Sequence, residues 1–474
     1  MSVAFRPTVQ EIREAVAGRL LNGSPDAPVE GFSIDTRTLR PGDLYFAIRG
    51  DRFDGHTFVQ EALDKGAMGA VVSTPPDGIS PVAVADRILI AVGDTTRALQ
   101  NVARWIRRRS NASVVAITGS AGKTTTKEIA AAFLAAGRKV MRSGGNLNNH
   151  IGLPLSLLEL RHGADVAVVE LGMNHAGEIS RLVAIAEPDV RVWTNVAEVH
   201  TEFFPSIEAI ADAKAEVLER AGAGTVVVAN ADDTRVMARL RAFPGRVITF
   251  GFGRANVRAL EVEDLGLEGT TSLLSTVSGE ARWRVPLPGR ANLSNALAAA
   301  AVAVHFGVPV ESIAEIAASL RPAAHRGEIV SLAGGITVLD DAYNSNPRAL
   351  QAVLNVVAAD TAHGRRIAVL GEMLELGDTS TTLHEECGRT AAAARLSHLI
   401  AVGGEPARAL AAAAVSAGMQ ASAVSYVKSS EEAAAAAAGI VRPGDLVLVK
   451  GSRGIRMERV VARLVAQFGP GEGR

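Results

Sequence analysis

The fold of this chain is decided by the stretch Val114-Val115-Ala116-Ile117-Thr118-Gly119-Ser120-Ala121-Gly122-Lys123-Thr124-Thr125. An apolar strand runs into a glycine turn, and Lys123 and Thr124 then open a helix. Glycines let backbone N–H groups converge on phosphate oxygens, and the N-terminus of the helix adds a favourable dipole. Lys123 can reach the terminal phosphates, and the hydroxyl of Thr124 can ligate Mg²⁺. A chance glycine turn is the alternative, but the strand–loop–helix context favours a nucleotide site.

The spacing within this loop is a shorter variant of the common phosphate loop. The common pattern places its first glycine five residues before the second, a position that Ile117 occupies here. The first glycine is instead Gly119, which gives the pattern G-x-x-G-K-T. We assign nucleotide binding to the residues of this loop, which are Gly119, Ser120, Ala121, Gly122, Lys123, Thr124 and Thr125.

Strands and helices alternate on both sides of the loop. A helix is predicted at Lys123–Ala136, directly after the loop. Further strands are predicted at Asp165–Glu170, Val190–Thr194, Thr225–Ala229 and Val247–Phe250. Such alternation predicts a parallel sheet with helices on both faces.

Length and texture divide the chain into three predicted domains, because domains of ~100–200 residues are usual. Residues 1–92 mix short strands with Gly, Pro and Asp turns, residues 93–324 hold the phosphate loop, and residues 325–474 again alternate strands with helices. Within the second domain, residues 256–287 are rich in β-forming residues and are interpreted as a hairpin appendage. The predicted fold class is α/β, with a small first domain, a central P-loop sheet and a C-terminal Rossmann-like domain.

Composition excludes several classes of function. The 49 basic and 50 acidic side chains leave a net charge of −1, so the chain has no electrostatic footprint for nucleic acid or an anionic membrane. No segment reaches the ~18–20 uninterrupted apolar residues of a membrane span. Cys387 is the only cysteine, which excludes an intrachain disulfide and a cysteine zinc cluster. The charged start of the chain predicts a helix rather than a signal peptide. We therefore expect a cytoplasmic protein without a nucleic-acid partner or membrane insertion.

Polar residues follow two strands near the phosphate loop. Glu170 ends an apolar strand, and the carboxyl ends of parallel strands face the ligand crevice. A carboxylate there can hold Mg²⁺ directly or through water, and a solvated strand end is the alternative. His200 follows the next strand, and the sequence leaves it open between a functional residue and an ordinary loop residue. Lys214 lies in a predicted helix, where composition alone indicates a surface lysine.

Five motifs around these residues resemble the central domain of the Mur ligase family. They are TGSAGKTT (118–125), GGNLNNHIGLP (144–154), VVELGMN (168–174), TNVAEVH (194–200) and AKAEV (213–217). Their order and spacing match the family along nearly the whole chain, and the shorter phosphate loop is also the family's form. The resemblance implies an ATP-dependent amide-bond ligase.

The resemblance changes the interpretation of Lys214. In the family the matching lysine is carbamylated by CO₂, which turns a cation into a carboxylate-like ligand for Mg²⁺. The reaction needs a neutral amine, and burial lowers the pKa of a lysine. The resemblance implies catalytic roles for Lys123, Lys214 and His200. The metal ligands that it implies are Thr124, Glu170, His200 and Lys214.

Other positions correspond to nucleotide contacts in the family. Asn292 and Asn295 match the positions that approach adenine, although Ala291 stands where the family usually has His. A helix N-cap is the alternative role of Asn292. The resemblance also supports ribose binding by Asp341 and phosphate binding by Arg326, whose alternative role is a salt bridge across the hinge.

The C-terminal region indicates which branch of the family the chain resembles. The stretches DDAYNSNP (340–347), GEMLELG (371–377) with His384, and VKGSR (449–453) resemble the branch that adds D-Ala-D-Ala. The base that deprotonates the amine is not identified, because His384 is open between that role and a structural one.

The first domain resembles the family's UDP-sugar-binding domain in SIDTR (33–37), FAIRG (46–50) and DGH (54–56). Over the whole chain, the implied substrate-binding residues are Ser33, Asp35, Thr36, Arg37, His56, Asn148, Asn149, Tyr343, Asn344 and Asn346.

The resemblance implies one reaction and leaves two alternatives. The implied enzyme joins D-Ala-D-Ala to UDP-MurNAc-tripeptide through an acyl phosphate, in peptidoglycan precursor synthesis, with ATP, Mg²⁺ and a carbamylated Lys214. A ligase of the same scaffold that adds diaminopimelate or lysine, or that acts on folates, is the first alternative. An ATPase that acts as a nucleotide switch is the second. We expect the protein to be a monomer.

Overall fold

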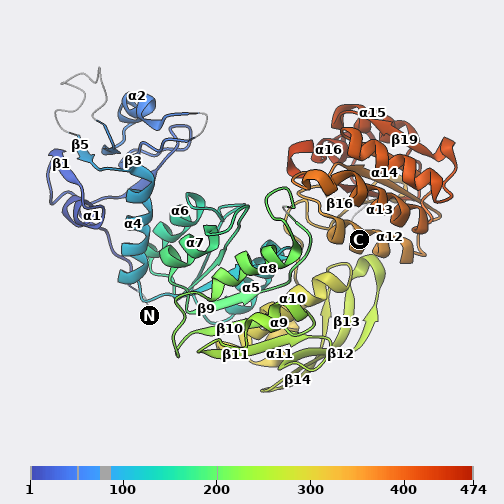
Figure 1. Cartoon of the computed structure of the whole chain (residues 1–474), viewed down its shortest axis with the longest axis horizontal. Coiled ribbons are helices and arrows are strands. Elements are labelled where there is room, and N and C mark those ends of the chain that lie inside the picture. The colour runs from blue at the N-terminus through green and yellow to red at the C-terminus, as the bar shows by residue number, and fades with distance from the viewer. Residues whose placement is uncertain (1–2, 51–52, 75–86, 200, 472–474) are drawn as a thin grey trace.

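The computed structural model describes residues 3–50, 53–74, 87–199 and 201–471. It contains three β-sheets, one in each predicted domain, and Figure 1 shows the three domains following one another across the molecule. The predicted α/β fold class with three domains is confirmed. The domain boundaries themselves stay predictions.

The first sheet has five strands in the order β1-β5-β4-β3-β2. Four of them are parallel to one another: β2 (Gly31–Ser33), β3 (Asp43–Phe46), β4 (Gly69–Val72) and β5 (Ile88–Ala91). The sequence predicts these four, from their apolar runs between turn residues, as strands at 31–34, 43–48, 70–72 and 88–92. The strand β1 (Arg19–Asn22) is antiparallel to β5 and was missed. It forms the edge of the sheet and none of its residues is fully buried, so it lacks an apolar pattern.

The helix α4 (Thr95–Arg109) connects the first domain to the second. It begins at Asp94, whose side chain accepts a hydrogen bond from the backbone N–H of Arg97, a standard N-cap. Its apolar face, with Leu99 and Ile106 fully buried, belongs to one core that includes residues of the first sheet and of the central sheet. The first two domains therefore share a continuous hydrophobic core.

The central sheet has nine strands in the order β14-β13-β12-β11-β10-β9-β6-β8-β7. The strands are β6 (Ser113–Thr118), β7 (Val140–Arg142), β8 (Val166–Glu170), β9 (Val190–Trp193), β10 (Val226–Asn230), β11 (Arg246–Gly251), β12 (Val257–Asp264), β13 (Thr270–Thr276) and β14 (Gly279–Val285). All neighbours from β7 to β12 are parallel, and β13 and β14 add two antiparallel pairings.

The segment 256–287 differs from the predicted hairpin appendage. It forms β12, β13 and β14, and β12 pairs with β11 through Phe250 and Val257, so the segment extends the central sheet. The physical reason is burial of one face: Val257, Leu274 and Trp283 lie in the same core as the neighbouring helices. A free hairpin would leave these side chains in water.

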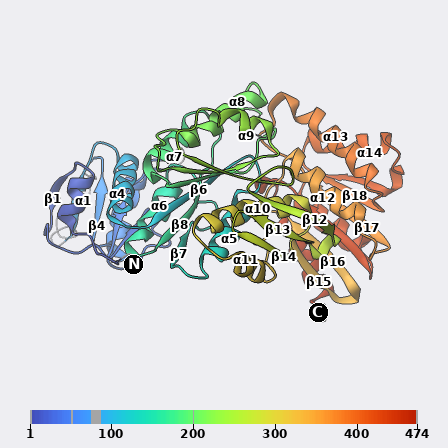
Figure 2. The same ribbon diagram turned by 90° about the horizontal axis from the view of Figure 1, so that it is seen from below.

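Helices cover both faces of the central sheet. On one face lie α5 (Lys123–Leu134), α10 (Arg290–His305) and α11 (Val310–Ala317), and on the other α4, α6 (Gly152–Leu158) and α7 (Glu178–Ala186). Alternate residues of β6 enter the two cores, Val115 on one face and Val114 on the other. In Figure 2, α5 and α11 lie on one side of the strands, whereas α7, α8 (Ile207–Ala215) and α9 (Thr234–Arg239) lie on the other.

The third sheet has six strands in the order β15-β16-β20-β17-β18-β19. They are β15 (Glu328–Leu332), β16 (Ile336–Asp341), β17 (Arg365–Gly371), β18 (His398–Val402), β19 (Val424–Val427) and β20 (Asp445–Lys450). One face packs on α12 (Pro347–Ala359), α13 (Ser380–Ala393) and α14 (Glu405–Ser416), and the other on α15 (Ser430–Ile440) and α16 (Glu458–Phe468). Because β20 lies between β16 and β17, the strand order reverses there, which creates a ligand crevice at the carboxyl ends of such strands.

None of the helices in the described part of the chain has the length and apolar character needed to cross a bilayer.

Candidate active site

The phosphate loop joins β6 to α5 and is closely packed at both glycines. Gly122 has φ of 82°, in the left-handed region, and a Cβ there would lie 2.1 Å from Oδ1 of Asn295. A Cβ on Gly119 would lie 1.9 Å from Oγ1 of Thr194. Only glycine fits either position. The two glycines of the shorter loop are therefore required by close contacts with Thr194, after β9, and with Asn295 in α10.

The end of β9 holds the loop in place. The backbone N–H of Ala121 donates to Oδ1 of Asn195 over 2.9 Å, and the hydroxyl of Thr194 donates to the carbonyl of Ala121 over 2.7 Å. The hydroxyl of Ser120 donates to the carbonyl of Ala197 over 3.1 Å. The polar residues after β9 therefore position the phosphate loop, a role that the sequence did not indicate for Asn195.

Lys123 opens α5 and folds back over the loop. Its ammonium donates to the carbonyl of Gly119 over 2.8 Å. Burial lowers the pKa of Lys123, with Glu170 opposing the shift and the positive charge of Arg326 adding to it. Arg326 of the third domain is therefore close enough to Lys123 for its positive charge to act on this ammonium group.

Glu170 ends β8 next to the loop. Its side chain is almost fully buried, and its Oε2 accepts a hydrogen bond from the hydroxyl of Thr124 over 3.2 Å. Its Oε1 is buried and accepts no hydrogen bond from the described residues, although Nζ of Lys127 lies 3.2 Å away as an ion pair. The hydroxyl of Thr124 and the carboxylate of Glu170, whose buried Oε1 accepts no hydrogen bond from the described residues, are oxygen ligands that suit Mg²⁺, so the residues present fit the metal.

Lys127 was missed in the sequence. It lies on α5 one turn after Lys123 and is fully buried. The only signal in the sequence is the spacing of four residues, which places two lysines on the same face of a helix that begins at the phosphate loop.

Lys214 is not the surface lysine that composition alone indicates. It lies in α8 and is 2% exposed. No hydrogen bond or ion pair joins its ammonium to another residue in the ranges that the structure describes. Burial, together with repulsion from Lys123, lowers the pKa of Lys214 well below its ordinary value. The side chain therefore tends toward the neutral amine that carbamylation requires.

His200 lies outside the described residues. The segments beside it connect the central and third domains: the hydroxyl of Thr201 donates to the carbonyl of Leu376 over 2.9 Å, and Nη1 of Arg348 donates to the carbonyl of Val196 over 3.2 Å. The loop after β9 thus contacts the phosphate loop on one side and the third domain on the other.

The two predicted adenine contacts lie on the first two turns of α10. Asn295 is buried beside Gly122, and its Nδ2 lies 3.4 Å from Oδ1 of Asn292. The N-cap of α10 is Gly289, without a side-chain cap, so the alternative role of Asn292 as an N-cap is wrong. Asn292 instead donates to the carbonyl of Pro288 over 2.8 Å.

The third domain contributes charged groups from the ends of β16 and β20. Asp341 pairs with the buried Lys450 over 2.5 Å, and Lys450 also donates to the carbonyl of Asn344 over 3.0 Å. The ring of Tyr343 lies between two guanidinium groups, 4.1 Å from Arg326 and 5.5 Å from Arg453. Within the described residues Arg326 forms no ion pair, which argues against its alternative role as a salt bridge across the hinge.

Two predicted substrate residues of this domain stabilise local turns. Oδ1 of Asn346 accepts from the backbone N–H of Ala349 over 2.9 Å and caps α12. Oδ1 of Asn344 accepts from the N–H of Ser345 over 2.9 Å. The Nδ2 groups of both amides are not used in these contacts.

His384 has a structural environment. It is fully buried, its Nε2 accepts from the backbone N–H of Met373 over 2.9 Å, and its Nδ1 donates to the carbonyl of Ser380 over 2.7 Å. Burial lowers the pKa of His384. Because both ring nitrogens are engaged by the backbone, the structural role is favoured over that of a general base.

The predicted UDP-sugar residues form two clusters in the first domain, apart from the phosphate loop (Figure 1). After β2, Asp35 pairs with Arg37 over 2.6 Å, which lowers the pKa of Asp35 to about 2, and Ser33 and Thr36 flank the pair. His56 is held by Asp54 over 2.6 Å and by Ser73, whose backbone N–H donates to Nε2 over 2.9 Å. These contacts fix the ring of His56, and its assignment to substrate binding stays a prediction.

Asn148 and Asn149 lie in the loop between β7 and α6, close to the end of β8. The carbonyl of Asn148 accepts from the N–H of Gly172, two residues after Glu170, over 2.9 Å. Oδ1 of Asn149 accepts from the N–H of Gly152 over 2.8 Å, at the start of α6.

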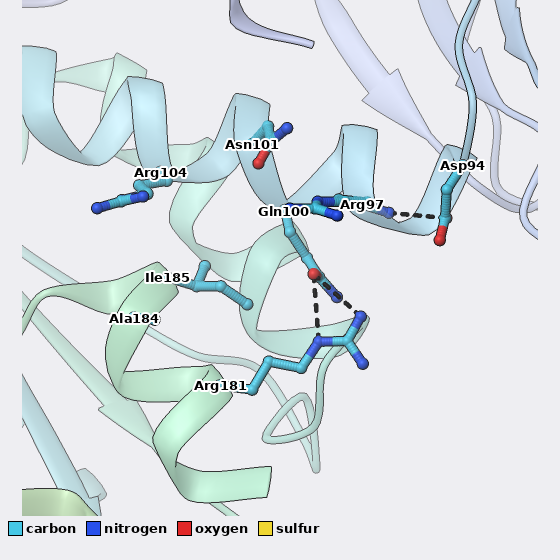
Figure 3. Close-up of a pocket in the computed structure, with 8 residues that line it drawn as sticks. All are labelled: Asp94, Arg97, Gln100, Asn101, Arg104, Arg181, Ala184 and Ile185. Atoms are coloured by element: carbon cyan, nitrogen blue, oxygen red, sulfur yellow. Dashed lines mark hydrogen bonds between the residues drawn. The ribbon is translucent and has the colours of Figure 1, made fainter. Parts of the chain in front are cut away.

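A pocket of about 470 Å³ adjoins this loop between α4 and α7 (Figure 3). Gln100 crosses its floor, accepting from Nη2 of Arg181 over 3.1 Å and donating to the carbonyl of His150 over 2.8 Å. Arg97 and Arg104 also line the pocket. It is a basic recess next to the Asn148–Asn149 loop and does not include the phosphate loop.

Three family profiles match the chain. The profile described as "Mur ligase family, catalytic domain" matches residues 28–106, "Mur ligase middle domain" matches 117–303, and "Mur ligase, glutamate ligase domain" matches 325–453. Together they cover most of the chain.

Curated relatives match over nearly the full length. The UDP-N-acetylmuramoyl-tripeptide–D-alanyl-D-alanine ligase of Bacillus subtilis is 33% identical, over 97% of this chain and 99% of its own length. The ligase of the same name from Treponema pallidum is 37% identical, over 95% of this chain and 97% of its own length.

Solved structures of similar fold include MurF from Acinetobacter baumannii, with a TM-score of 0.87 and 31% identity over 98% of this chain and 99% of that one. MurF from Thermotoga maritima in complex with ADP has a TM-score of 0.80 and 28% identity, over 93% and 98% of the two chains. A folylpolyglutamate synthase of Mycobacterium tuberculosis with ADP is 18% identical, covers 79% of this chain and 94% of its own, and has a TM-score of 0.61, so it shows the shared fold alone.

Proposed function

The chain belongs to the Mur ligase family, and from that premise we infer that it joins D-Ala-D-Ala to UDP-MurNAc-tripeptide with hydrolysis of ATP, a step of peptidoglycan precursor synthesis. The curated relatives at 33% and 37% identity carry this activity in their names. A diaminopimelate-adding ligase of solved structure is only 20% identical, so the relatives favour the dipeptide over a single amino acid.

The observation that supports the proposal is a pair of cations beside one buried carboxylate at the phosphate loop. Glu170 and Arg326 are the charged groups that act on Lys123, and Arg326 comes from the third domain. Such a charge distribution suits a polyphosphate, which brings several negative charges to one place. ADP in the Thermotoga relative supports a nucleotide here.

We propose that ATP lies between the phosphate loop and the third domain. Its phosphates would meet the backbone N–H groups of Gly119–Thr125, Lys123 and Arg326. The base would approach Asn292 and Asn295, and Asp341, held by Lys450, would accept hydrogen bonds from the ribose. Thr124, Glu170, His200 and a carbamylated Lys214 would hold Mg²⁺, which when bound neutralises the phosphates and the charge that develops in transfer.

The chemistry is a displacement at phosphorus followed by acyl transfer. A carboxylate oxygen of the tripeptide attacks the γ-phosphorus, the bond from that phosphorus to the β–γ bridging oxygen breaks, and ADP leaves. The amine of D-Ala-D-Ala attacks the acyl carbon, and the tetrahedral intermediate loses inorganic phosphate and a proton. Lys123 stabilises charge on the phosphoryl oxygens, and the contacts between the central and third domains keep water from the acyl phosphate.

The substrates are assigned to residues on the two sides of the phosphate loop, in the first and third domains. UDP-MurNAc would bind to the first domain at Ser33, Asp35, Thr36 and Arg37, and the peptide would extend along Asn148 and Asn149. D-Ala-D-Ala would bind near Tyr343, Asn344 and Asn346. We also propose, as the sequence suggests, that the protein is a cytoplasmic monomer.

A panel of acceptors tests the proposal. With ATP, Mg²⁺ and UDP-MurNAc-tripeptide, we expect release of one phosphate per product and a mass increase equal to D-Ala-D-Ala less one water. Diaminopimelate or lysine with UDP-MurNAc-dipeptide should give no product. Turnover with a single amino acid instead of the dipeptide would select the other branch, and ATP hydrolysis without any coupled product would select a nucleotide switch.

A further inference from the structure

Lys127 is a buried cation that the reaction as proposed does not use. Its side chain is 1% exposed, and its ammonium contacts three segments of the chain. Nζ donates to the carbonyl of Ser143 over 2.7 Å and lies 3.0 Å from Oε1 of Glu128 and 3.2 Å from Oε1 of Glu170. A lysine is almost never fully buried unless its charge is paired. Lys127 can be buried because these carbonyl and carboxylate oxygens surround its ammonium group.

One of the partners belongs to the metal site. Lys127 lies beside Oε1 of Glu170, whereas the hydroxyl of Thr124 binds Oε2. The carboxylate is therefore fixed from both sides, and its rotation about the terminal bond is restricted. Loss of a group that orients a metal ligand in this way typically lowers metal affinity or activity by about 10–100-fold.

A second partner, Ser143, begins the segment 143–149, which ends with the predicted substrate residues Asn148 and Asn149. Ser143 follows β7, and its N–H donates to the carbonyl of Val168 in β8 over 3.1 Å. Five residues later, the carbonyl of Asn148 accepts from Gly172, and a Cβ on Gly172 would lie 2.9 Å from the amide of Asn148. The segment 143–148 is thus attached to β8 at both ends, on either side of Glu170.

Lys127 contacts both Glu170 and the start of this segment from α5. The loop of residues 143–148 is fixed to β8 by backbone hydrogen bonds, and Lys127 is the side chain that contacts both the loop and Glu170. A shift of Glu170 on metal binding would move the ammonium, and with it the carbonyl of Ser143. The second ion pair, with Glu128, extends to Arg142 at the end of β7 over 3.1 Å.

We propose that Lys127 is a positioning residue that couples the magnesium–nucleotide site to the loop that holds the peptide carboxylate of the acceptor. It orients Glu170 for the divalent cation and sets the place of Asn148 and Asn149 at the same time. The identity of the acceptor in this inference rests on the proposed function. The coupling of Lys127 to the metal site does not.

The variants Lys127→Met and Lys127→Gln test the proposal, with Lys139→Met as the matched control. Lys139 belongs to the same domain and also donates to a backbone carbonyl, that of His162 over 2.5 Å, but it is exposed. Lys127→Met fills the space without a charge, and Lys127→Gln keeps a hydrogen-bond donor. Thermal unfolding shows which variants fold.

Calorimetric titration of ATP at a series of Mg²⁺ concentrations is the main readout. For Lys127→Met we expect the ATP affinity measured in EDTA to stay within twofold of that of the parent. The Mg²⁺ concentration that gives half of the maximal increase in ATP affinity should rise about 10–100-fold. The KM for the UDP-linked substrate should rise in parallel, Lys127→Gln should lie between, and Lys139→Met should match the parent. A folded Lys127→Met protein with unchanged Mg²⁺ requirement and unchanged KM would overturn the proposal.

The parent protein provides a test that needs no variant. Coupling between two sites requires that each ligand change the affinity of the other by the same factor. We expect Mg²⁺ with a non-hydrolysable ATP analogue to tighten binding of the UDP-linked substrate at least about fivefold, and equal affinity with and without it contradicts the coupling. If the parent forms no product with D-Ala-D-Ala, the proposed function fails, yet the Mg²⁺ titration still decides the role of Lys127.

Discussion

Replacement of Lys123 with alanine is expected to lower kcat by at least about 10²–10³-fold, because the ammonium provides charge stabilisation where the γ-phosphoryl group is transferred. The ammonium is held within the phosphate loop by the carbonyl of Gly119, and Arg326 of the third domain is one of the charged groups that act on it. The fold should survive, since the side chain makes a single hydrogen bond to the carbonyl of Gly119. Coupled phosphate release and product mass measure the effect.

Lys139→Ala is the control for this variant. Lys139 lies in the same domain, directly before β7, and is exposed. Its ammonium donates to the carbonyl of His162. It should retain the parent rate. A Lys123→Ala protein that couples D-Ala-D-Ala at the rate of this control would show that phosphoryl transfer does not depend on the loop lysine.

Replacement of Lys214 with alanine is expected to cause a loss of similar size, by a different physical route. The buried amine has no counterion among the described residues, and its lowered pKa favours the neutral form that reacts with CO₂. As a carbamate it would supply a negative ligand to the metal beside Lys123. Alanine removes that ligand and leaves a cavity, so acetate or formate should restore part of the activity of the variant.

Lys214→Met provides the matched control for the rescue. Methionine fills the same volume, and a short carboxylate then has no space to bind, so acetate should not restore its activity. The parent protein should lose activity in CO₂-depleted buffer and regain it with bicarbonate, whereas neither variant should respond. Full activity of Lys214→Ala without any added acid would exclude the carbamate.

The parts of the fold that repeat a local pattern were predictable. The strand Ser113–Thr118, the phosphate turn and the helix after it follow from apolar periodicity and glycine chemistry, and the order of strands and helices then defines a sheet covered on both faces. The placement of β12–β14 was not predictable, because it depends on contacts between distant segments. Val257 and Trp283 pack in the same core as α10 and α11.

The site shows the same division between local and long-range information. Lys123 and Thr124 are identified by their position in the loop, whereas Lys214 is indistinguishable from a surface lysine until the fold buries it. Asn195 and Lys127 were missed because their roles come from contacts with segments 74 and 43 residues away in the chain, at Ala121 and Glu170. Family resemblance supplied Lys214 and the adenine-side asparagines, but it did not supply Lys127.

The phosphate loop is proposed to bring ATP to the terminal carboxylate of the peptide, so that one oxygen of this carboxylate leaves with inorganic phosphate when the amide forms. We therefore single out a reaction with UDP-MurNAc-tripeptide labelled with ¹⁸O in both oxygens of that carboxylate. The released phosphate should carry one ¹⁸O atom, and the new amide should retain the other. Unlabelled phosphate, formed at the same rate as the dipeptide product, would contradict an acyl phosphate and with it the role assigned to the loop.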